Sequence, residues 1–291
     1  MMPKRWSTAR AATMLAGVAL VAAACSSSGS SEQAIGSGAP SPSPSPSASA
    51  SASAHTMPMQ PGAAKMHVSV TSPGPGLVLT GNVLTLHVTA SGYHLSCAWA
   101  GKPARPGIGH YHVLLDGSLI NMFCTPTARI SMQDVAPGTH TIEVVPAQDD
   151  HAEVLENAQK MPFTYRPKHP LPAVAPSAGA GAPSVRILEP KNGAVLHGAF
   201  AVKVAFQNFH SSCGLLGKPD VAGFGHWHVN LDTMSGPMMG MGTMLGMACT
   251  TTFHGTTVGL EPGTTHTLFA LLTDNGHAPL GPFAKITFTV G

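Results

Sequence analysis

One stretch occurs twice in this chain, as Gly109-His110-Tyr111-His112-Val113-Leu114-Leu115-Asp116 and as Gly225-His226-Trp227-His228-Val229-Asn230-Leu231-Asp232. In each copy two histidines alternate with an aromatic residue and a valine. Successive side chains of a β-strand point to opposite faces, so this period of two predicts a strand with its histidines on one face and its apolar side chains on the other. The sequence therefore presents one strand twice, each time with a pair of imidazoles.

The agreement between the two copies extends beyond these strands. Aligned without gaps, residues 91–116 match residues 207–232 at many positions, including a cysteine and a Gly-Lys-Pro triplet. A repeat of this extent predicts two homologous domains. We place them at residues 65–166 and 184–291, with a linker rich in Pro, Ala and Gly at residues 167–183.

Both predicted domains have the pattern of short β-strands. Residues 83–88 and 200–206 alternate with a period of two, and Pro-Gly turns separate such segments. About 100 residues of short strands with regular turns is typical of an immunoglobulin-like sandwich. We therefore predict an all-β protein with two tandem immunoglobulin-like β-sandwich domains after a disordered tether.

The N-terminus has the pattern of an export signal. Lys4, Arg5 and Arg10 precede an apolar run at residues 11–24, which is short for a membrane-spanning helix. The run ends in small residues before Cys25, which resembles a bacterial lipoprotein signal. That resemblance implies a signal peptide at residues 1–24 and lipidation of the Cys25 thiol, and a plain secretory signal is the alternative.

The segment after the lipidation site has a composition that cannot build a core. Residues 25–64 are dominated by Ser, Pro, Ala and Gly, which predicts an extended, disordered tether. The chain is then expected to be held by its lipid on the extracytoplasmic face of the cell membrane. A formal net charge of only +2 gives no sign of a nucleic-acid partner.

Four cysteines remain after Cys25, and four cysteines can pair in three ways. The repeat favours one pair within each domain, and an exported chain meets an oxidising compartment. Each disulfide would contribute about 3–4 kcal/mol in the chain-entropy model. Copper or zinc ligation by these thiols is the alternative. The predicted disulfides are Cys97–Cys124 and Cys213–Cys249.

The histidines of the repeated strand are candidate metal ligands. Residues i and i+2 of a strand share a face about 7 Å apart. His110 and His112 therefore lie side by side, as do His226 and His228, and two imidazoles can bind copper or zinc if further ligands converge. The alternative is a hydrogen-bonded face packed on a neighbouring strand. Further candidates that the repeat retains are His94, His151, His210, His277, His140 and His266.

A Met-rich segment follows the second repeated strand, at residues 233–247. Thioethers suit Cu(I), and a Gly-rich loop lets several of them converge. The alternative is a flexible apolar loop, since Met fills irregular gaps. This segment is the feature that favours copper over zinc, and its candidate ligands are Met238, Met239, Met241 and Met244.

The repeated motifs resemble those of an uncharacterised group of exported bacterial immunoglobulin-like domains. They are the Gly-His-x-His-Val-x-Leu-Asp strand, the Pro-Gly-x-His-Thr strand at residues 137–141 and the Asp-x-His-Ala loop at residues 149–152. The resemblance covers both domains and implies an exported or lipoprotein-type β-sandwich without an established activity. A weaker similarity is to Cu,Zn superoxide dismutase, whose copper strand also reads His-x-His. The zinc loop of that family is not recognisable here.

These features together favour a membrane-anchored, extracytoplasmic protein that binds a metal for handling or delivery, with copper preferred and zinc as the alternative. The competing interpretation is a non-catalytic interaction module of the cell envelope, with structural histidines and an envelope protein as its partner. A third interpretation is an enzyme, for which copper redox chemistry is the class that stays open, because no Ser/His/Asp arrangement, carboxylate pair or phosphate loop stands out. Leu114 stands where the second copy has Asn230, and we expect the first copy to be the more structural of the two.

Overall fold

The computed structural model describes residues 58–177, 179, 181–235 and 240–291. The predicted signal peptide, Cys25, most of the tether, Met238 and Met239 lie outside the described residues. Within the described ranges, no helix is long and apolar enough to cross a membrane. The described residues from Pro58 onward belong to one compact unit.

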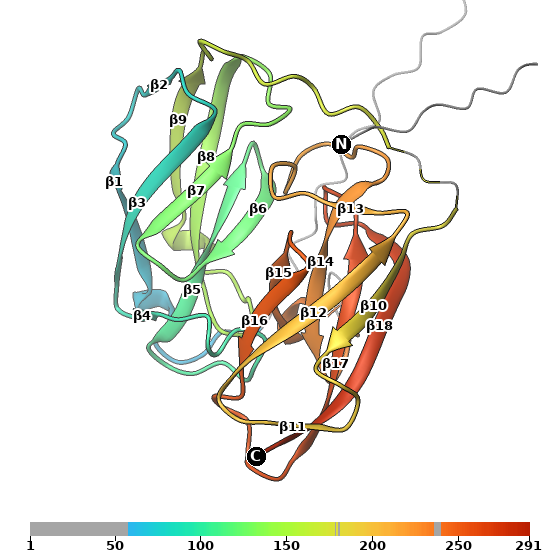
Figure 1. Cartoon of the computed structure of the whole chain (residues 1–291). Helices are drawn as coiled ribbons and strands as arrows, with labels where there is room; N and C mark the ends of the chain where they lie inside the picture. Colours follow the sequence, from blue (N-terminus) through green and yellow to red (C-terminus); the bar gives the residue numbers. More distant parts are fainter. Residues whose placement is uncertain (1–57, 178, 180, 236–239) are drawn as a thin grey trace, which may run out of the picture. The chain divides into compact units, whose positions relative to one another are not determined.

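The first sandwich consists of two β-sheets, coloured blue to yellow-green in Figure 1. Its strands are β1 (His67–Ser72), β2 (Val78–Leu79), β3 (Val83–Ser91), β4 (His94–Leu95), β5 (Ile108–Leu115), β6 (Ser118–Phe123), β7 (Thr127–Ser131), β8 (Gly138–Ala147) and β9 (Gln159–Tyr165), with the 3-10 helices η1 (Ala63–Lys65) and η2 (Leu155–Asn157). The smaller sheet has the order β1-β3-β7. The larger sheet has the order β2-β9-β8-β5-β4, and β6 pairs with β5.

The second sandwich repeats this arrangement, coloured yellow to red in Figure 1. Its elements are β10 (Ser184–Glu189), β11 (Ala194–Leu196), β12 (Ala199–Gln207), β13 (His210–Ser211), β14 (Phe224–Leu231), η4 (Met241–Thr243), β15 (Met244–Ala248), β16 (Thr252–Thr256), β17 (Thr265–Thr273) and β18 (Pro279–Val290). The sheet orders are β10-β12-β16 and β11-β18-β17-β14-β13, and β15 pairs with β14.

The strand order in both sandwiches is immunoglobulin-like. A three-stranded antiparallel sheet faces a larger sheet, and a short second strand runs parallel to the last strand, as β2 does with β9 and β11 with β18. Consecutive strands therefore cross between the sheets, as in the Greek-key sandwiches of immunoglobulin and fibronectin type III domains. The prediction of an all-β chain with two tandem immunoglobulin-like sandwiches is confirmed.

The alternation in the repeated strand separates a core face from a histidine face. Tyr111 and Val113 of β5 are fully buried within the first sandwich, and Trp227 and Val229 of β14 are fully buried within the second. Each large aromatic ring keeps its polar atom paired: Tyr111 Oη donates to Thr125 O, and Trp227 Nε1 donates to the equivalent backbone carbonyl of the second sandwich. The histidines of both strands consequently point out of their own sandwich.

Both predicted disulfides are present, Cys97–Cys124 and Cys213–Cys249. Each links the loop before the repeated strand to the end of the edge strand beside it, with Cα atoms 5.4 Å and 4.8 Å apart. The four sulfur atoms are joined in pairs, so they are not thiolate ligands of a metal. The bridges hold the edge strands β6 and β15 against the rest of their sheets.

The predicted linker at residues 167–183 lies along both sandwiches. Lys168 N–H donates to Thr80 O of the first sandwich, and Ser177 N–H donates to Ala222 O of the second. An extended backbone makes no internal hydrogen bonds, so the N–H and C=O groups of the linker are available to neighbouring loops. The end of the tether behaves similarly, because Gln60 N–H donates to Gln148 Oε1.

Candidate metal centres

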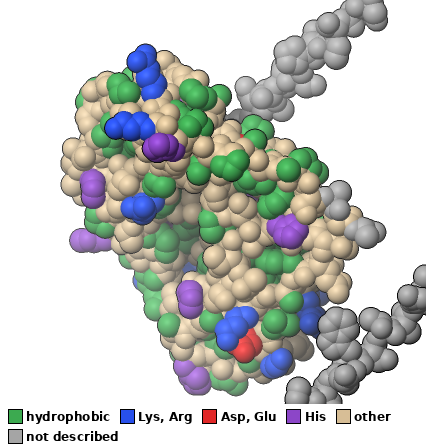
Figure 2. Space-filling model, turned by 45° about the horizontal axis from the view of Figure 1, so that its top comes forward, with side chains coloured by type: hydrophobic (Ala, Val, Ile, Leu, Met, Phe, Trp, Pro, Cys, Tyr) green, Lys and Arg blue, Asp and Glu red, His purple; other side chains and the backbone are tan. Residues whose placement is uncertain are grey.

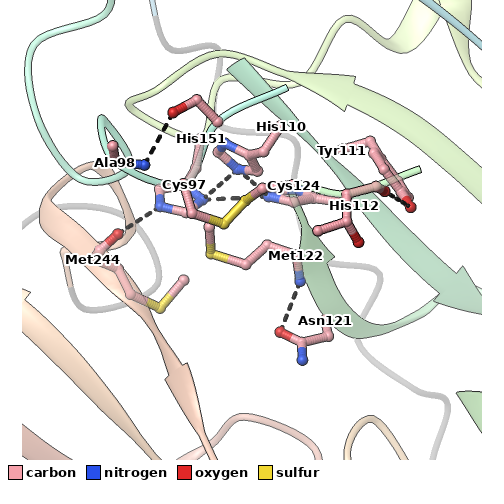
Figure 3. Close-up of a disulfide and its surroundings, with 12 residues drawn as sticks. Cys97, Ala98, His110, Tyr111, His112, Asn121, Met122, Cys124, His151 and Met244 are labelled. Carbon is pink, nitrogen blue, oxygen red and sulfur yellow. Dashed lines mark hydrogen bonds between the residues drawn. A yellow bond between two sulfur atoms is a disulfide. The ribbon is translucent and has the colours of Figure 1, made fainter. Parts of the chain in front are cut away.

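Three histidines of the first sandwich converge on one point. His110 and His112 extend from β5, and His151 lies in the loop between β8 and β9. His110 Nε2 lies 3.1 Å from His112 Nε2 and 3.0 Å from His151 Nδ1. The remaining distance, from His112 Nε2 to His151 Nδ1, is 3.3 Å. Figure 3 shows these three rings, which we call the first triad.

The second sandwich builds the same arrangement from His226 and His228 of β14 and from His277, in the loop between β17 and β18. His226 Nε2 lies 3.0 Å from His228 Nε2 and 2.9 Å from His277 Nδ1. His277 Nδ1 lies 3.4 Å from His228 Nε2. These residues form the second triad, and each triad is complete within one sandwich.

The loop histidine of each triad has a left-handed backbone conformation. The φ angles are 65° for His151 and 71° for His277. A residue other than Gly rarely adopts this conformation, which costs about 1–3 kcal/mol and is concentrated at functional sites. The loop turns sharply there, with His151 N–H donating to Gln148 O. This turn directs the ring back over the strand pair.

The two triads have the dimensions of a metal site. A triangle with the measured sides has its centre about 1.8 Å from each nitrogen, and an ion just above that plane would lie at the ~2.0–2.1 Å typical of imidazole ligation. Three nitrogens also leave a coordination position for a further ligand. Both groups of three histidines can therefore hold a metal ion.

Hydrogen bonds on the far side of the rings fix where the protons are in the first triad. His112 Nδ1 lies 2.6 Å from Glu153 Oε1, and His151 Nε2 lies 2.7 Å from Met244 O. Both partners are acceptors, so each ring carries its proton on that side. His112 Nε2 and His151 Nδ1 then face each other with lone pairs. Such outward hydrogen bonds orient metal-binding histidines in general.

The second triad has one of these two outward contacts. His277 Nε2 donates to Leu119 O, at 2.7 Å. The position equivalent to Glu153 is occupied by Pro279, which has no side-chain acceptor. In both triads the carbonyl that accepts from the loop histidine belongs to the edge strand or adjoining turn of the other sandwich, Met244 in β15 and Leu119 in β6.

Burial favours the neutral form of most of the triad histidines. It lowers the pKa of His110 well below its usual value, and the neighbouring His151 and His112 lower that pKa further. Burial also lowers the pKa of His151 to about 3 and that of His228 to about 3. The rings of His277 and His151 also lower the pKa of His228. Since His151 belongs to the first triad, the two triads interact electrostatically across the boundary between the sandwiches.

The other predicted histidines lie outside the triads. His94 in β4 and His210 in β13 are exposed, and His210 Nε2 contacts Ser177 Oγ. His140 and His266 each bond, through Nδ1, to the Asp that ends the repeated strand, at 2.7 Å. On the face shown in Figure 2, the exposed histidines are scattered rather than gathered. They support turns or face solvent.

Of the four predicted methionine ligands, Met241 and Met244 lie within the described residues. Met241 begins η4, and Met244 begins β15, where its side chain is buried and its carbonyl accepts from His151. The polar face predicted at Asn230 also has a structural role, because Asn230 Nδ2 donates to Gly240 O at 2.8 Å. This contact ties the segment to β14.

Two methionines that the sequence analysis did not select lie beside the triads. Met122 of β6 is the direct cross-strand partner of His112, and Met247 of β15 is the partner of His228. Directly paired residues of an antiparallel ladder share a face, and Figure 3 shows Met122 next to the first triad. Both methionines also line one cavity of about 330 Å³. The strand register places these two methionines opposite the histidines. A bulge in β6 and another in β15 shift that register by one residue, so the sequence pattern does not predict it.

Comparisons with known proteins find only solved structures of low similarity. No family model matches the chain, and no curated protein matches it. Among solved structures, fibronectin(III)-like modules of Clostridium thermocellum CbhA are 14% identical with a TM-score of 0.25, and the match covers 77% of this chain and 93% of that one. Chicken CNTN1 FN1–FN3 is 10% identical with a TM-score of 0.21, covering 77% and 65%. The sheet topology by itself makes the chain a tandem β-sandwich protein, with one histidine triad in each sandwich.

Proposed function

We propose that the protein binds two transition-metal ions, one at each triad. The observation that supports this most strongly is the pair His112 Nε2 and His151 Nδ1. Their protons are held on the far side of each ring by Glu153 and Met244 O, so two lone pairs face each other at 3.3 Å. A proton on His110 Nε2 can satisfy only one of these lone pairs. A cation at the centre stabilises all three nitrogens at once.

Copper is the ion we propose. Neutral imidazoles suit both copper and zinc, and the thioethers of Met122 and Met247 on the same faces add soft ligands that suit Cu(I). Burial lowers the pKa of His151 and that of His228 to about 3, so an ion meets these two imidazoles in their neutral form.

The setting we propose is the extracytoplasmic face of the cell membrane, where a lipid on Cys25 holds the chain. The two disulfides are compatible with an oxidising compartment. In that location a buried site of three neutral ligands would serve copper handling or delivery to an envelope protein.

Metal loading of the mature chain tests the proposal. The protein is equilibrated with Cu(I), Cu(II) and Zn(II) in separate samples, and bound metal is measured by mass spectrometry. We expect two copper ions per chain, and one ion for either His110→Ala/His112→Ala or His226→Ala/His228→Ala. The matched control His94→Ala/His210→Ala removes two exposed histidines and should keep both ions.

The competing function is a non-catalytic interaction module in which the triads are structural. It is favoured by the contacts of His151 and His277 with backbone carbonyls across the boundary between the sandwiches. Absence of stoichiometric metal at micromolar free ion would support it over the metal-binding proposal. Tighter binding of Zn(II) than of copper would overturn the choice of ion alone.

A further inference from the structure

The Gly-Lys-Pro triplet that both repeats share lies at the boundary between the sandwiches. Gly101 has a φ of 70°, and a methyl group on it would lie 2.6 Å from Met244 O of the second sandwich. Gly217 has a φ of 67°, and a methyl group on it would overlap Leu119 O of the first sandwich. Each Gly therefore lets its loop pack directly against the edge strand of the other sandwich.

The carbonyls that these glycines contact are the ones that hold the triads. Met244 O accepts from His151, and Leu119 O accepts from His277. Within each sandwich the loop that carries this Gly is also hydrogen-bonded to the loop that carries the triad histidine. Gly101 N–H donates to Asp149 O at 2.7 Å, and Gly217 N–H donates to Asn275 O at 2.8 Å. The glycine loop and the histidine loop of each sandwich therefore both contact the edge strand of the other sandwich.

The Lys of the first triplet extends this contact. Lys102 is 3% exposed, and its ammonium donates to Ala98 O in its own loop, at 2.8 Å, and to Thr256 O of the second sandwich, at 2.9 Å. It also donates to Val258 O, again in the second sandwich. A buried ammonium with three carbonyl partners binds the two sandwiches in a defined position.

This arrangement makes the outward hydrogen bond of each loop histidine depend on contact between the sandwiches. When the sandwiches are in contact, His151 and His277 are held with the proton on Nε2 and the lone pair of Nδ1 directed into the triad. When they separate, both carbonyls are lost together and each ring is free to rotate or change tautomer. The loop histidines of both triads therefore have their outward hydrogen bonds only when the two sandwiches are in contact.

We propose that Gly101, Lys102 and Gly217 couple the two metal centres, so that contact between the sandwiches strengthens metal binding at both. This inference rests on the proposed function. Because coupling free energies are reciprocal, an ion at one centre stabilises the contact and thereby favours binding at the other. The repeated triplet, which has no role in ligation, acquires a role as a positioning element.

The test places a substitution in one sandwich and measures metal at the centre in the other. The parent is the full chain carrying His226→Ala/His228→Ala, which leaves only the first centre. Adding Gly217→Ala, in the second sandwich, should weaken Cu(I) and Zn(II) binding at the first centre by about 10–100-fold, the range for loss of outward partners of metal ligands. Competition with a chromophoric chelator measures the affinity.

The control isolates backbone strain from contact between the sandwiches. Gly193 is in the second sandwich with a φ of 79°, and a methyl group there would meet nothing within 4 Å. Gly193→Ala in the same parent carries the same left-handed strain and should leave the first centre unchanged. Equal affinities for Gly217→Ala and Gly193→Ala would overturn the coupling.

A second variant covers the case in which Gly217→Ala does not fold. The parent His110→Ala/His112→Ala leaves only the second centre, and Lys102→Met keeps the side-chain length while removing its donors. We expect weaker binding at the second centre, whereas the exposed Lys160→Met should have no effect. An unchanged affinity in Lys102→Met would also overturn the coupling. If both parents bind no metal, the proposed function itself is contradicted, which is a separate outcome.

Discussion

The first and second triads have nearly the same inner geometry and different surroundings. In both, two strand histidines and one left-handed loop histidine bring nitrogens to within 3.4 Å or less of one another. In the first, Glu153 accepts from His112 at 2.6 Å, whereas Pro279 stands at the equivalent position of the second. Both copies of the repeat have the three histidines, and only the first has a carboxylate that accepts from one of them. The two centres should therefore bind the same metal with different affinities.

The comparison also bears on the expected difference between the two copies. The first copy was predicted to be the more structural because it has Leu114 in place of Asn230 and no Met-rich segment. In the structure, Asn230 Nδ2 donates to Gly240 O and so anchors that segment. The first triad has the more complete set of outward hydrogen bonds, which makes it the better-defined of the two centres.

The largest effect is expected from removing a loop histidine. His151→Ala should eliminate tight binding at the first centre and His277→Ala at the second, because each loses one of three ligands. The loss should exceed the roughly 100-fold upper range for outer partners. Metal stoichiometry and chelator competition measure it. Two equally weakened centres after His151→Ala would contradict the assignment of separate triads.

A smaller effect is expected from the outer partner that distinguishes the centres. Glu153→Ala should weaken the first centre about 10–100-fold and bring it close to the second. Glu153→Gln keeps an acceptor for His112 and should weaken it less. Glu156→Ala, an exposed carboxylate in the adjoining η2, is the matched control. Should Glu153→Ala bind as tightly as the unchanged protein, the outer partner would not explain any difference between the centres.

Acid should destabilise the metal-free protein through the buried His151 and His228. Their folded-state pKa values are lowered, to about 3 for His151 and for His228, while in the unfolded chain a histidine titrates near ~6.5. Between these values the unfolded state binds more protons, so the contribution of these two histidines to the unfolding free energy falls as the pH falls below ~6.5 and is constant above it. The slope is at most about 1.4 kcal/mol per pH unit for each such histidine.

Urea unfolding of the metal-free chain between pH 7.5 and pH 5 measures this dependence. His151→Gln and His228→Gln should each reduce the slope, and the double variant should reduce it most. A stability that does not change over this interval would show that the triads are accessible to protons in the folded state.

The smallest effect is expected at the exposed histidines. His94→Ala and His210→Ala should change the unfolding free energy by no more than about 0.5 kcal/mol, as is usual for surface positions. Thermal unfolding measures this. A large loss at His210 alone would indicate that its contact with Ser177 fastens the linker to the second sandwich.

Local patterns were sufficient for much of the fold and for part of each triad. The period of two placed His110 and His112 on one face, and the same rule placed His226 and His228. The repeat identified the cysteine pairs and singled out His151 and His277, but it equally retained His94 and His210. Periodicity cannot separate a histidine that a loop turns back over the sheet from one that faces solvent.

The amino-acid sequence by itself determined the two sandwiches, their disulfides and the paired imidazoles, because strand alternation and repetition are encoded between near neighbours. The tertiary structure alone decided which loop histidine closes each triad, that Glu153 supports one of them, and that Met122 and Met247 lie beside them. It also placed Met244 O and Leu119 O against the loop histidines. These contacts join residues far apart in the chain, and they depend on strand register, backbone turns and packing between the sandwiches, which no local pattern specifies.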